Sequence, residues 1–327
     1  MIERLVKSGE PSVRFKVRTR VLGEDADSPA MGRLRSAIRK GPRVQALMAE
    51  ATDDAPPPFH PYAKWHGAHW IMTTLADIGY PAHDERLIPW REQVYEWLLR
   101  HDGEPRQRPV INGRRRNCAS QEGNAVYYLL TLGLADERTE RLVRVLTEDQ
   151  WPDGGWNCDK KPEAVNSSYH ESITPLRALA LHARMTGSAA SAAAAERAAQ
   201  VFLKRRLLFR LSDGQIIHAS FGQLHYPPYW HYDLLFGLKV MAEAGSIGDP
   251  RCADALDLLE SKRLPEGGWP AESSYYKVLG GSIARRKSGT ELVSWAPVGK
   301  TQMNEWVTAD ALYVLKSAGR LGATGAI

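Results

Sequence analysis

The stretch DQWPDGGWNCD, residues 149–159, holds the feature that decides the fold. Its two glycines can adopt positive φ and reverse the chain tightly, and the tryptophan after them can pack between helices. A second copy with its tryptophan intact, KRLPEGGWPAE, occupies residues 262–272, and a degraded copy, SDGQ, occupies residues 212–215. A turn that recurs in this way is expected to do the same structural job each time.

Five segments of the chain share one pattern, in which a polar or aromatic start precedes an apolar helical run and a closing glycine. The closing glycines are Gly79, Gly133, Gly187, Gly245 and Gly319. A glycine just past a periodic run ends a helix, and a more charged run with one apolar face follows most of these glycines. The sequence therefore predicts an all-α fold of inner and outer helix pairs, with almost no strand.

Helix pairs of this kind stack into an open solenoid or close into a toroid. The run QWPDGGW, residues 150–156, resembles the QW repeat of squalene–hopene cyclases and of the wider family of terpene cyclases and protein prenyltransferase β subunits. The chain also resembles bacterial prenyltransferase and squalene-oxidase-repeat proteins. The resemblance covers roughly residues 58–320 and implies an α/α toroid with a central cavity at one end of the inner helices. The repeat indicates a fold and not an activity.

The chain divides into three regions by pattern. Residues 1–50 are interpreted as a further helical pair, residues 51–63 as a Pro-rich linker or cavity-edge loop, and residues 64–327 as the α/α toroid domain.

The bulk composition is that of an ordinary soluble globular protein, with 43% apolar and 25% charged residues among 327. The net charge of +5 is scattered, and no nucleic-acid-binding motif occurs, which argues against a nucleic-acid partner. Three cysteines argue against a disulfide framework and for a reducing compartment. The N-terminus lacks an apolar signal core, and no apolar stretch approaches the ~20 residues of a membrane span. We expect a cytoplasmic protein with no integral membrane span; its oligomeric state stays open.

The starts of the inner helices carry polar side chains that a toroid would bring together at one mouth. They are His66 and His69; Cys118, Gln121 and Glu122; His170 and Glu171; His231 and Asp233; and Glu305, Thr308 and Asp310. The free N–H groups of helix N-termini at such a mouth also favour an anion. This recurrence predicts a site for a small-molecule substrate.

One interpretation of this site is acid–base chemistry without a metal. Class II terpene cyclases protonate an alkene with an Asp-x-Asp-Asp motif, and because that motif is absent here a different acid is needed. Glu122 and Asp233 adjoin aromatic residues or His231, where partial burial would raise a carboxyl pKa. The catalytic candidates are Glu122, His170, His231 and Asp233. The substrate-binding candidates are His66, His69, Trp70, Gln121, Asn124, Tyr169, Trp230, Tyr232, Glu305, Trp306 and Asp310, whose aromatic members suit an apolar or cationic guest or simple helix packing.

A second interpretation is a zinc site, since thiolate and imidazole together suit Zn²⁺. Protein farnesyltransferase β subunits, which the fold resembles, bind zinc through an Asp and a Cys separated by one residue at one inner-helix start and a His at the next. Cys118 and His170 match two of these positions, whereas Arg116 stands where the Asp would be. The metal candidates are Cys118, Cys158, Asp159 and His170.

Other interpretations of these residues stay open. The lanthionine cyclases resemble the zinc arrangement in using Cys, Cys and His on an α/α toroid, but their Cys-His-Gly motif is absent. Without a metal, Cys118 and Cys158 would be small buried apolar residues, as we expect for Cys252 on an outer helix. The basic loop at residues 114–116 would attract phosphate or carboxylate at a cavity mouth and would otherwise be a solvated loop.

The sequence favours an enzyme that acts on a small, apolar, isoprenoid-like substrate, or on one that also carries an anionic group. The reaction classes that fit are cyclisation, isomerisation and group transfer, with either no cofactor or zinc. The alternatives are a zinc-assisted hydrolase or lyase on the same scaffold, and a non-enzymatic helical-repeat module that binds a ligand or peptide.

Overall fold

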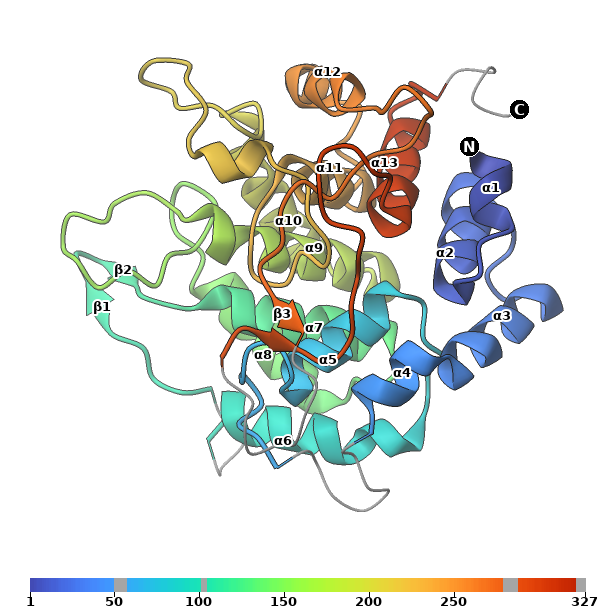
Figure 1. Cartoon of the computed structure of the whole chain (residues 1–327). Helices are drawn as coiled ribbons and strands as arrows, with labels where there is room; N and C mark the ends of the chain where they lie inside the picture. The colour runs from blue at the N-terminus through green and yellow to red at the C-terminus, as the bar shows by residue number, and fades with distance from the viewer. Residues whose placement is uncertain (50–57, 101–104, 279–287, 322–327) are drawn as a thin grey trace.

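A computed structural model describes residues 1–49, 58–100, 105–278 and 288–321. In this part of the chain, helix pairs are arranged as a ring, as Figure 1 shows. The inner helices are α5 (Ala68–Asp77), α7 (Ala119–Thr131), α9 (Tyr169–Thr186), α11 (Leu234–Glu243) and α13 (Glu305–Ser317). The outer helices are α6 (Ile88–Leu98), α8 (Glu137–Glu148), α10 (Ala189–Leu203) and α12 (Ala253–Ser261). Each inner helix packs against the next one along the chain, which confirms the all-α toroidal arrangement.

The inner helices end at the five glycines that the sequence indicated. Gly79, Gly133, Gly187, Gly245 and Gly319 all have φ between 65° and 80°, a conformation that side chains other than glycine rarely adopt. A Cβ at Gly79 would also lie 2.4 Å from the ring of Phe15. Glycine at this position therefore both ends α5 and admits the N-terminal helices.

Burial separates the inner from the outer helices. Every residue of α5 is buried, whereas α8 buries only Thr139, Leu142, Val143, Val145 and Leu146. A helix that is apolar over most of its circumference needs neighbours on both sides, and a helix with one apolar face can cover a surface. Within the described ranges, no helix is both long and apolar enough to cross a membrane.

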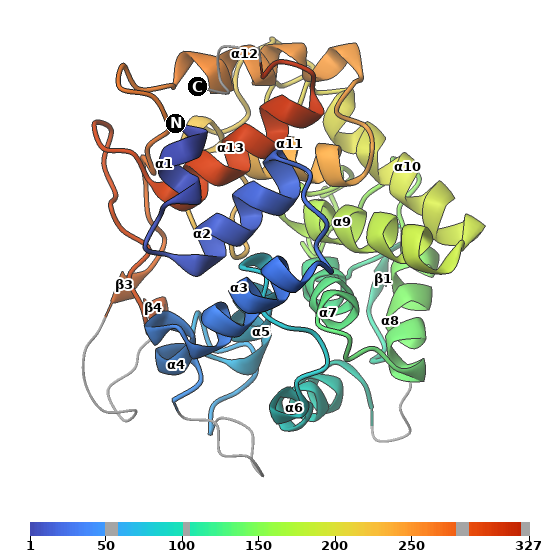
Figure 2. The ribbon, with the colours of Figure 1, turned by 90° about the vertical axis from the view of Figure 1, so that its right-hand side faces the viewer.

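The N-terminal segment closes the ring. It consists of α1 (Ile2–Val6), α2 (Pro11–Lys16), the π-helical turn η1 (Val17–Val21), α3 (Pro29–Lys40) and α4 (Pro42–Leu47). Helix α2 and η1 pack against α13 on one side, and Figure 2 shows α2 between α13 and the region of α3 and α5. Lys16 Nζ reaches Asp77 Oδ2 of α5 at 3.0 Å. The segment thus joins the last inner helix to the first; residues 50–57 of the expected linker lie outside the described residues.

The two Gly-Gly-Trp turns form the same hydrogen bonds. In the first, Trp151 N donates to Gly155 O at 2.8 Å, and in the second Leu264 N donates to Gly268 O at 2.9 Å. The indole of Trp156 donates to Leu146 O of α8, and that of Trp269 donates to Leu259 O of α12. The backbone N–H of each tryptophan donates to a hydroxyl of the next inner helix, Ser172 in the first turn and Thr308 in the second. Each turn therefore fastens an outer helix to the following inner helix.

The stretch at residues 212–215 is not a third copy of this turn. Arg210 N donates to Gln215 O and Gly214 N donates to Arg210 O, so this loop is one residue longer between its paired ends. It has no tryptophan to bury, and residues 211–216 are all exposed. The expectation of a degraded copy is therefore wrong in its hydrogen bonding.

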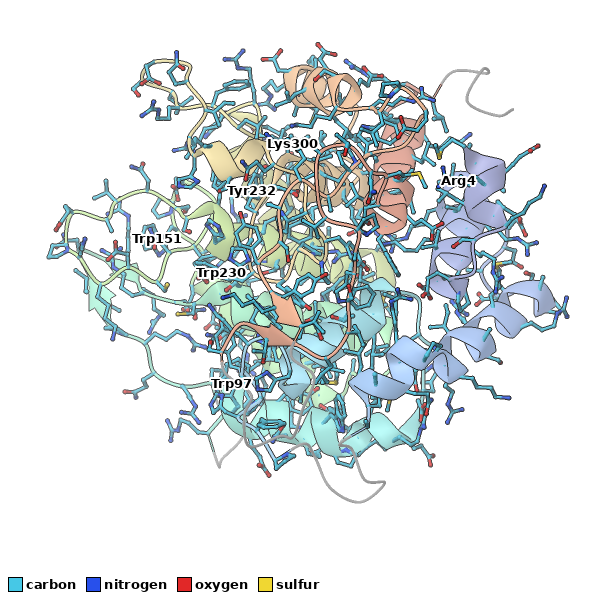
Figure 3. The ribbon with its side chains drawn as sticks, in the orientation of Figure 1. Arg4, Trp97, Trp151, Trp230, Tyr232 and Lys300 are labelled. Carbon is cyan, nitrogen blue, oxygen red and sulfur yellow. The ribbon has the colours of Figure 1, made fainter. Side chains whose placement is uncertain are left out.

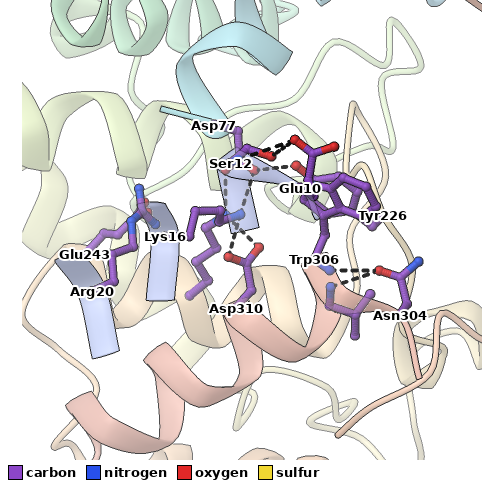
Figure 4. A network of polar contacts seen from close by, with 12 residues as sticks. Glu10, Ser12, Lys16, Arg20, Asp77, Tyr226, Glu243, Asn304, Trp306 and Asp310 are labelled. Carbon is purple, nitrogen blue, oxygen red and sulfur yellow. Dashed lines mark hydrogen bonds and ion pairs between the residues drawn. The ribbon is translucent and has the colours of Figure 1, made fainter. Parts of the chain in front are cut away.

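The centre of the ring holds a cluster of buried charges, which Figure 4 shows in part. Asp77 Oδ1 lies 2.6 Å from Lys239 Nζ of α11, and Asp310 of α13 lies 2.7 Å from Lys16 and 2.8 Å from Lys239. Arg177 of α9 adds a contact to Asp77 at 3.5 Å. Opposite charges neutralise one another here, as burial demands. Charged side chains of the described residues therefore occupy the centre of the ring at this level.

Residues 270–278 and 288–304, here called the covering segment, lie over the N-terminal ends of the inner helices. The covering segment carries β3 (Lys277–Val278) and β4 (Thr290–Glu291), which pair in parallel. Trp65 N donates to Thr290 O at 2.8 Å, and Figure 1 shows β3 in front of the inner helices. On the other side, β1 (Val110–Ile111) and β2 (Arg114–Arg115) form a short antiparallel hairpin before α7.

Candidate active site

Helices α7 and α9 approach closely near their N-terminal ends because Gly123 has no side chain. A Cβ at this position would lie 2.4 Å from the backbone nitrogen of Pro175. Thr174 Oγ1 donates to Ser120 O at 3.1 Å, and Ser120 N donates to Glu171 Oε2 at 3.0 Å. This close approach brings the first turns of both helices, with their glutamates, to one mouth of the ring.

Glu171 is a buried carboxyl group at this mouth that contacts residues of three other segments. Its Oε1 accepts from the indole N–H of Trp230 at 3.3 Å and lies 3.6 Å from the thiol of Cys158. Its side chain is almost fully buried, with 3% of the residue exposed. Burial raises the pKa of the Glu171 carboxyl, although the N–H of Ser120 and the indole of Trp230 partly oppose this effect. The carboxyl is thus held in a fixed orientation by donors from two other elements.

Glu122 is a second buried carboxyl group on the first turn of α7. Its Oε1 pairs with the guanidinium of Arg108, and within the described residues its buried Oε2 has no hydrogen-bond partner. Burial raises the pKa of Glu122, Arg108 lowers it, and the charge of Glu171 raises it further. An unpaired buried oxygen is costly, and such atoms are concentrated where a ligand completes the bonding.

Four half-buried side chains form the surface of the mouth, and two of them, Tyr62 and Trp230, lie next to Glu171. They are Tyr62, Lys64, Gln121 and Trp230, and Trp230 is labelled in Figure 3. Lys64 Nζ lies 5.2 Å from the centre of the Trp230 ring and 5.9 Å from that of the Tyr62 ring. Two aromatic faces beside one ammonium group suit an apolar molecule that carries an anionic end.

Aromatic side chains form the floor beneath this rim. Trp65 stacks on Tyr229 with ring centroids 4.4 Å apart, and Trp70 meets Trp65 edge to face at 4.7 Å. His66 Nδ1 lies 3.3 Å from Thr290 Oγ1, which connects the floor to the covering segment. Trp70 and His66 therefore line the mouth from below as buried residues.

A polar cluster lies deeper, between α5 and α7. His69 Nδ1 lies 3.1 Å from the hydroxyl of Tyr128, and Asn124 Nδ2 lies 3.3 Å from His69 Nε2 and 2.6 Å from Thr73 Oγ1. Burial lowers the pKa of His69 to about 3, so its imidazole is neutral. The polar atoms of His69 and the amide nitrogen of Asn124 are thus bonded to one another or to Tyr128 and Thr73. These side chains therefore belong to the polar cluster between the helices and not to the rim.

The other two histidines of the mouth are also neutral. His170 stacks on Trp230 with centroids 4.4 Å apart, and His231 stacks on Tyr275 at 3.6 Å. Burial lowers the pKa of His170 to about 4 and that of His231 to about 3, with neighbouring histidines adding to both shifts. Imidazoles with such pKa values are weak bases, and here their faces are used for packing.

Asp233 has a structural environment. Its Oδ1 accepts from Phe236 N at 2.7 Å and so caps the N-terminus of α11. Its Oδ2 lies 2.8 Å from Nδ1 of the buried His225. Both carboxylate oxygens of Asp233 therefore already have partners, Phe236 N and His225 Nδ1, within the protein. This arrangement does not favour the predicted catalytic role.

Five of the remaining predicted residues do not join the rim. Tyr169 and Tyr232 pack together at 4.9 Å and belong to the core beneath α9 and α10. Trp306 packs against Trp295, Glu305 accepts from Ser8 Oγ at 2.7 Å, and Asp310 belongs to the central charge cluster. Trp306, Glu305 and Asp310 lie on α13, whereas Tyr169 and Tyr232 are part of the hydrophobic core.

The predicted zinc ligands are only partly brought together. Cys118 and Cys158 are neighbours and Glu171 adjoins them, but His170 is stacked on Trp230. Asp159 lies in an exposed loop, where its carboxylate accepts from Lys161 N at 3.0 Å. Within the described ranges, no three His, Cys, Asp or Glu side chains are arranged to hold a metal ion. The described residues therefore do not form the predicted zinc site, in which Cys118 and His170 would be joined by Cys158 or Asp159.

A surface pocket of about 420 Å³ opens beside the rim. Its walls are Phe59, His60, Tyr62, Ala63, Lys64, His66 and Ser288. Tyr62 and Lys64 are shared with the rim around Glu171, so a ligand in this pocket would lie against the same aromatic face. The basic loop at residues 114–116 faces elsewhere: Arg115 pairs with Asp149 at 2.7 Å, and Arg116 binds the carbonyl of Ala164.

Sequence reasoning missed several residues of this site. It placed Glu171 among the polar helix starts but chose His170, its neighbour, for catalysis, and the structure places the carboxyl of Glu171 at the centre of the mouth. Arg108, Tyr62 and Lys64 come from irregular segments that carry no periodic signal. Another omitted carboxyl is Glu291 of β4, which is buried in the covering segment with its Oε1 2.7 Å from Leu292 N.

No protein-family model and no curated protein sequence matches the chain. Solved structures with a related architecture include a protein from Actinoplanes, with 15% identity over 94% of this chain and 90% of that one and a TM-score of 0.44. The type II terpene cyclase MstE from Scytonema shows 14% identity over 95% and 88%, with a TM-score of 0.46. An unsaturated glucuronyl hydrolase specific for heparin shows 10% identity over 95% and 84%, with a TM-score of 0.47. The class of fold is an α/α toroid, as the ring of helix pairs in this chain itself defines.

Proposed function

We propose that the protein is an enzyme in which Glu171 protonates a small, largely apolar substrate. The observation that carries this proposal is the environment of the Glu171 carboxyl. It is almost fully buried, its pKa is raised, and donors from α7 and from the Trp230 loop hold it in place. A general acid must keep its proton near working pH and must be held within reach of the substrate, and the raised pKa and fixed position of Glu171 support this role.

The substrate class follows from the rim. Tyr62 and Trp230 offer aromatic faces that would stabilise positive charge developing on a protonated hydrocarbon. Lys64 supplies a cation for an anionic end group, close to Trp230. An isoprenoid-like alkene, alone or bearing such a group, fits this combination. Protonation of its double bond begins a cyclisation or an isomerisation, and we favour these two reactions.

Glu122 is the second acid–base group in this scheme. The unpaired Oε2 of Glu122 belongs to a carboxyl whose other oxygen is neutralised by Arg108. A carboxylate held beside a cation can accept the proton that a cationic intermediate loses at the end of the reaction. The scheme therefore needs one carboxyl protonated and the other ionised. Burial raises the pKa of Glu122, and the pairing with Arg108 opposes this shift and favours the ionised form.

Deuterium incorporation tests the proposal without knowledge of the exact substrate. The purified chain is incubated in heavy water with a panel of linear isoprenoid alkenes and their alcohols and phosphates, and products are analysed by mass spectrometry. Protonation on carbon leaves one deuterium in the product. Glu171→Gln is expected to abolish incorporation while the quenching of tryptophan fluorescence by the bound compound persists. Glu305→Gln, a glutamate of α13 that bonds Ser8, should behave like the wild type.

Two results would contradict the proposal. Incorporation that survives in Glu171→Gln would show that another group donates the proton. Tight binding of panel members with no incorporation in the wild type would favour the non-enzymatic binding module instead.

A further inference from the structure

Two of the three cysteines lie side by side at the edge of the mouth, although they are 40 positions apart in the sequence. Cys118 is the N-cap residue of α7, and Cys158 follows the first Gly-Gly-Trp turn. Asn117 N donates to Asn157 O at 3.2 Å, so the residues just before the two cysteines are joined backbone to backbone. The two thiols are close enough for each to shift the pKa of the other.

Both segments are held firmly in this position. Arg108 Nε donates to Asn117 Oδ1 at 2.6 Å, and Asn157 Nδ2 donates to Asn166 O at 2.9 Å. The Gly-Gly-Trp turn, anchored on α8 and α9, fixes the start of the loop that carries Cys158. Neighbouring chains held at hydrogen-bonding distance suit the Cα separation of about 4–7 Å that a disulfide needs. Both cysteines are only half-buried, so a small oxidant can reach them.

We propose that Cys118 and Cys158 form a dithiol site that reacts reversibly with peroxides to give an intramolecular disulfide. The inference is independent of the proposed function, because it stands whether or not Glu171 acts as an acid on a substrate.

The two sulfurs have different roles in this reaction. Cys118 lies at the N-terminus of a 13-residue helix, whose free N–H groups favour a thiolate. The interaction with Cys158 lowers the pKa of the Cys118 thiol, while the interaction with Cys118 and burial raise the pKa of Cys158. Cys118 is therefore the attacking thiolate and Cys158 the resolving thiol.

The reaction balances with a hydroperoxide as the oxidant. The Cys118 thiolate attacks one peroxide oxygen, the O–O bond breaks, and Cys118 becomes a sulfenic acid as hydroxide leaves and takes up a proton. The sulfur of Cys158 then attacks the sulfur of Cys118, loses its proton, and expels the sulfenic oxygen as water. In total, two thiols and one hydrogen peroxide give one disulfide and two waters, and a dithiol reductant reverses the change.

Oxidation would also alter the surroundings of Glu171. The thiol of Cys158 is a donor to Glu171 Oε1, and a disulfide sulfur has no proton to donate. Formation of the disulfide therefore removes one hydrogen bond from that carboxyl group. The remaining bonds from Ser120 and Trp230 are unaffected.

Mass spectrometry of the full chain tests the dithiol site. The reduced protein is treated with hydrogen peroxide and its intact mass is measured; it is then unfolded in urea, remaining thiols are blocked with N-ethylmaleimide, and peptides are mapped without reduction. We expect loss of two hydrogens from the intact mass, a Cys118–Cys158 cross-link, and one blocked thiol, that of Cys252. Cys252→Ser should form the same cross-link, because Cys252 is fully buried near α12. Dithiothreitol should restore the reduced mass.

A second measurement separates the attacking thiol from the resolving one. With a limiting amount of iodoacetamide near neutral pH, Cys118 of the wild type should be alkylated at least about tenfold faster than Cys158. In Cys158→Ser, peroxide should drive Cys118 on to the sulfinic acid, since no resolving thiol is present. Peroxide treatment that yields sulfinic acids but no cross-link in the wild type, or a cross-link that includes Cys252, would overturn the proposal.

Discussion

Lys239 Nζ lies 2.6 Å from Asp77 Oδ1, and this contact ties α11 to α5 across the centre of the ring. The same ammonium reaches Asp310 of α13 at 2.8 Å, and Lys16 of α2 contacts both carboxylates. Four helices that are distant in the sequence therefore share one buried charge cluster. Such a cluster specifies which helices meet, because any other pairing would leave a charge without a partner.

Removing one member of this cluster should be costly. Asp77→Asn leaves Lys16 and Lys239 with one carboxylate fewer, and we expect a loss of about 3–5 kcal/mol in the free energy of unfolding. Urea denaturation followed by circular dichroism measures it. The matched control is Asp254→Asn, whose carboxylate pairs with Arg206 at the surface and should cost less than about 1 kcal/mol. Equal, small effects of the two substitutions would contradict a stabilising role of the cluster.

The two Gly-Gly-Trp turns should respond alike to mutation. Trp156→Phe and Trp269→Phe each remove an indole donor from a buried outer-helix carbonyl and leave a small cavity. Each is expected to lower the free energy of unfolding by about 2–4 kcal/mol. Thermal and urea denaturation of both variants measure the effect, with the exposed Met185→Ala as a control. If one tryptophan proved dispensable and the other essential, the two turns would not have the same structural role.

The covering segment should give stability a specific pH dependence through Glu291. Burial raises the pKa of Glu291 to about 8, so the folded protein holds a proton that the unfolded chain loses near pH 4.5. The folded state binds more protons between these two values, and stability therefore falls as pH rises through this window. The contribution of this residue to that fall is about 1.4 kcal/mol per pH unit.

Glu291→Gln tests this dependence, because the amide keeps the shape of the neutral carboxyl and does not titrate. The free energy of unfolding, measured from pH 5 to pH 8, should fall less steeply in the variant than in the wild type. The variant should be the more stable of the two at the upper end of the range. Parallel curves for the two proteins would show that Glu291 is ionised in the folded state.

The fold was largely predictable because its signals are local. Each closing glycine and the apolar run before it form a pattern of fewer than 20 consecutive residues. All five inner helices lie at the positions that these patterns predicted. The repeated turn was recognised for the same reason. The role of the N-terminal helices in closing the ring depends on Lys16 meeting Asp77, a contact over 61 positions that no local pattern reveals.

The site was less predictable because it depends on which way neighbouring side chains point. His170 and Glu171 are adjacent on one helix, and successive helical residues face directions about 100° apart. The sequence alone does not tell which of the two faces the ring's mouth. Similarly, Asp233 was a candidate acid, but its role as the N-cap of α11 and partner of His225 arises from a turn that brings residue 225 back to it. Lys64 and Arg108 lie in irregular segments, which periodicity does not describe.

The proton on Glu171 is the central claim, and infrared difference spectroscopy measures it most directly. Spectra of the wild type minus Glu171→Gln are recorded across a pH series, with Glu305→Gln as the matched subtraction. We predict a protonated-carboxyl band that persists well above pH 4.5, is absent from Glu171→Gln and is unchanged in Glu305→Gln, because burial raises the pKa of Glu171. A Glu171 that titrates at or below pH 4.5 would be a carboxylate under working conditions, and this result would contradict its assignment as the proton donor.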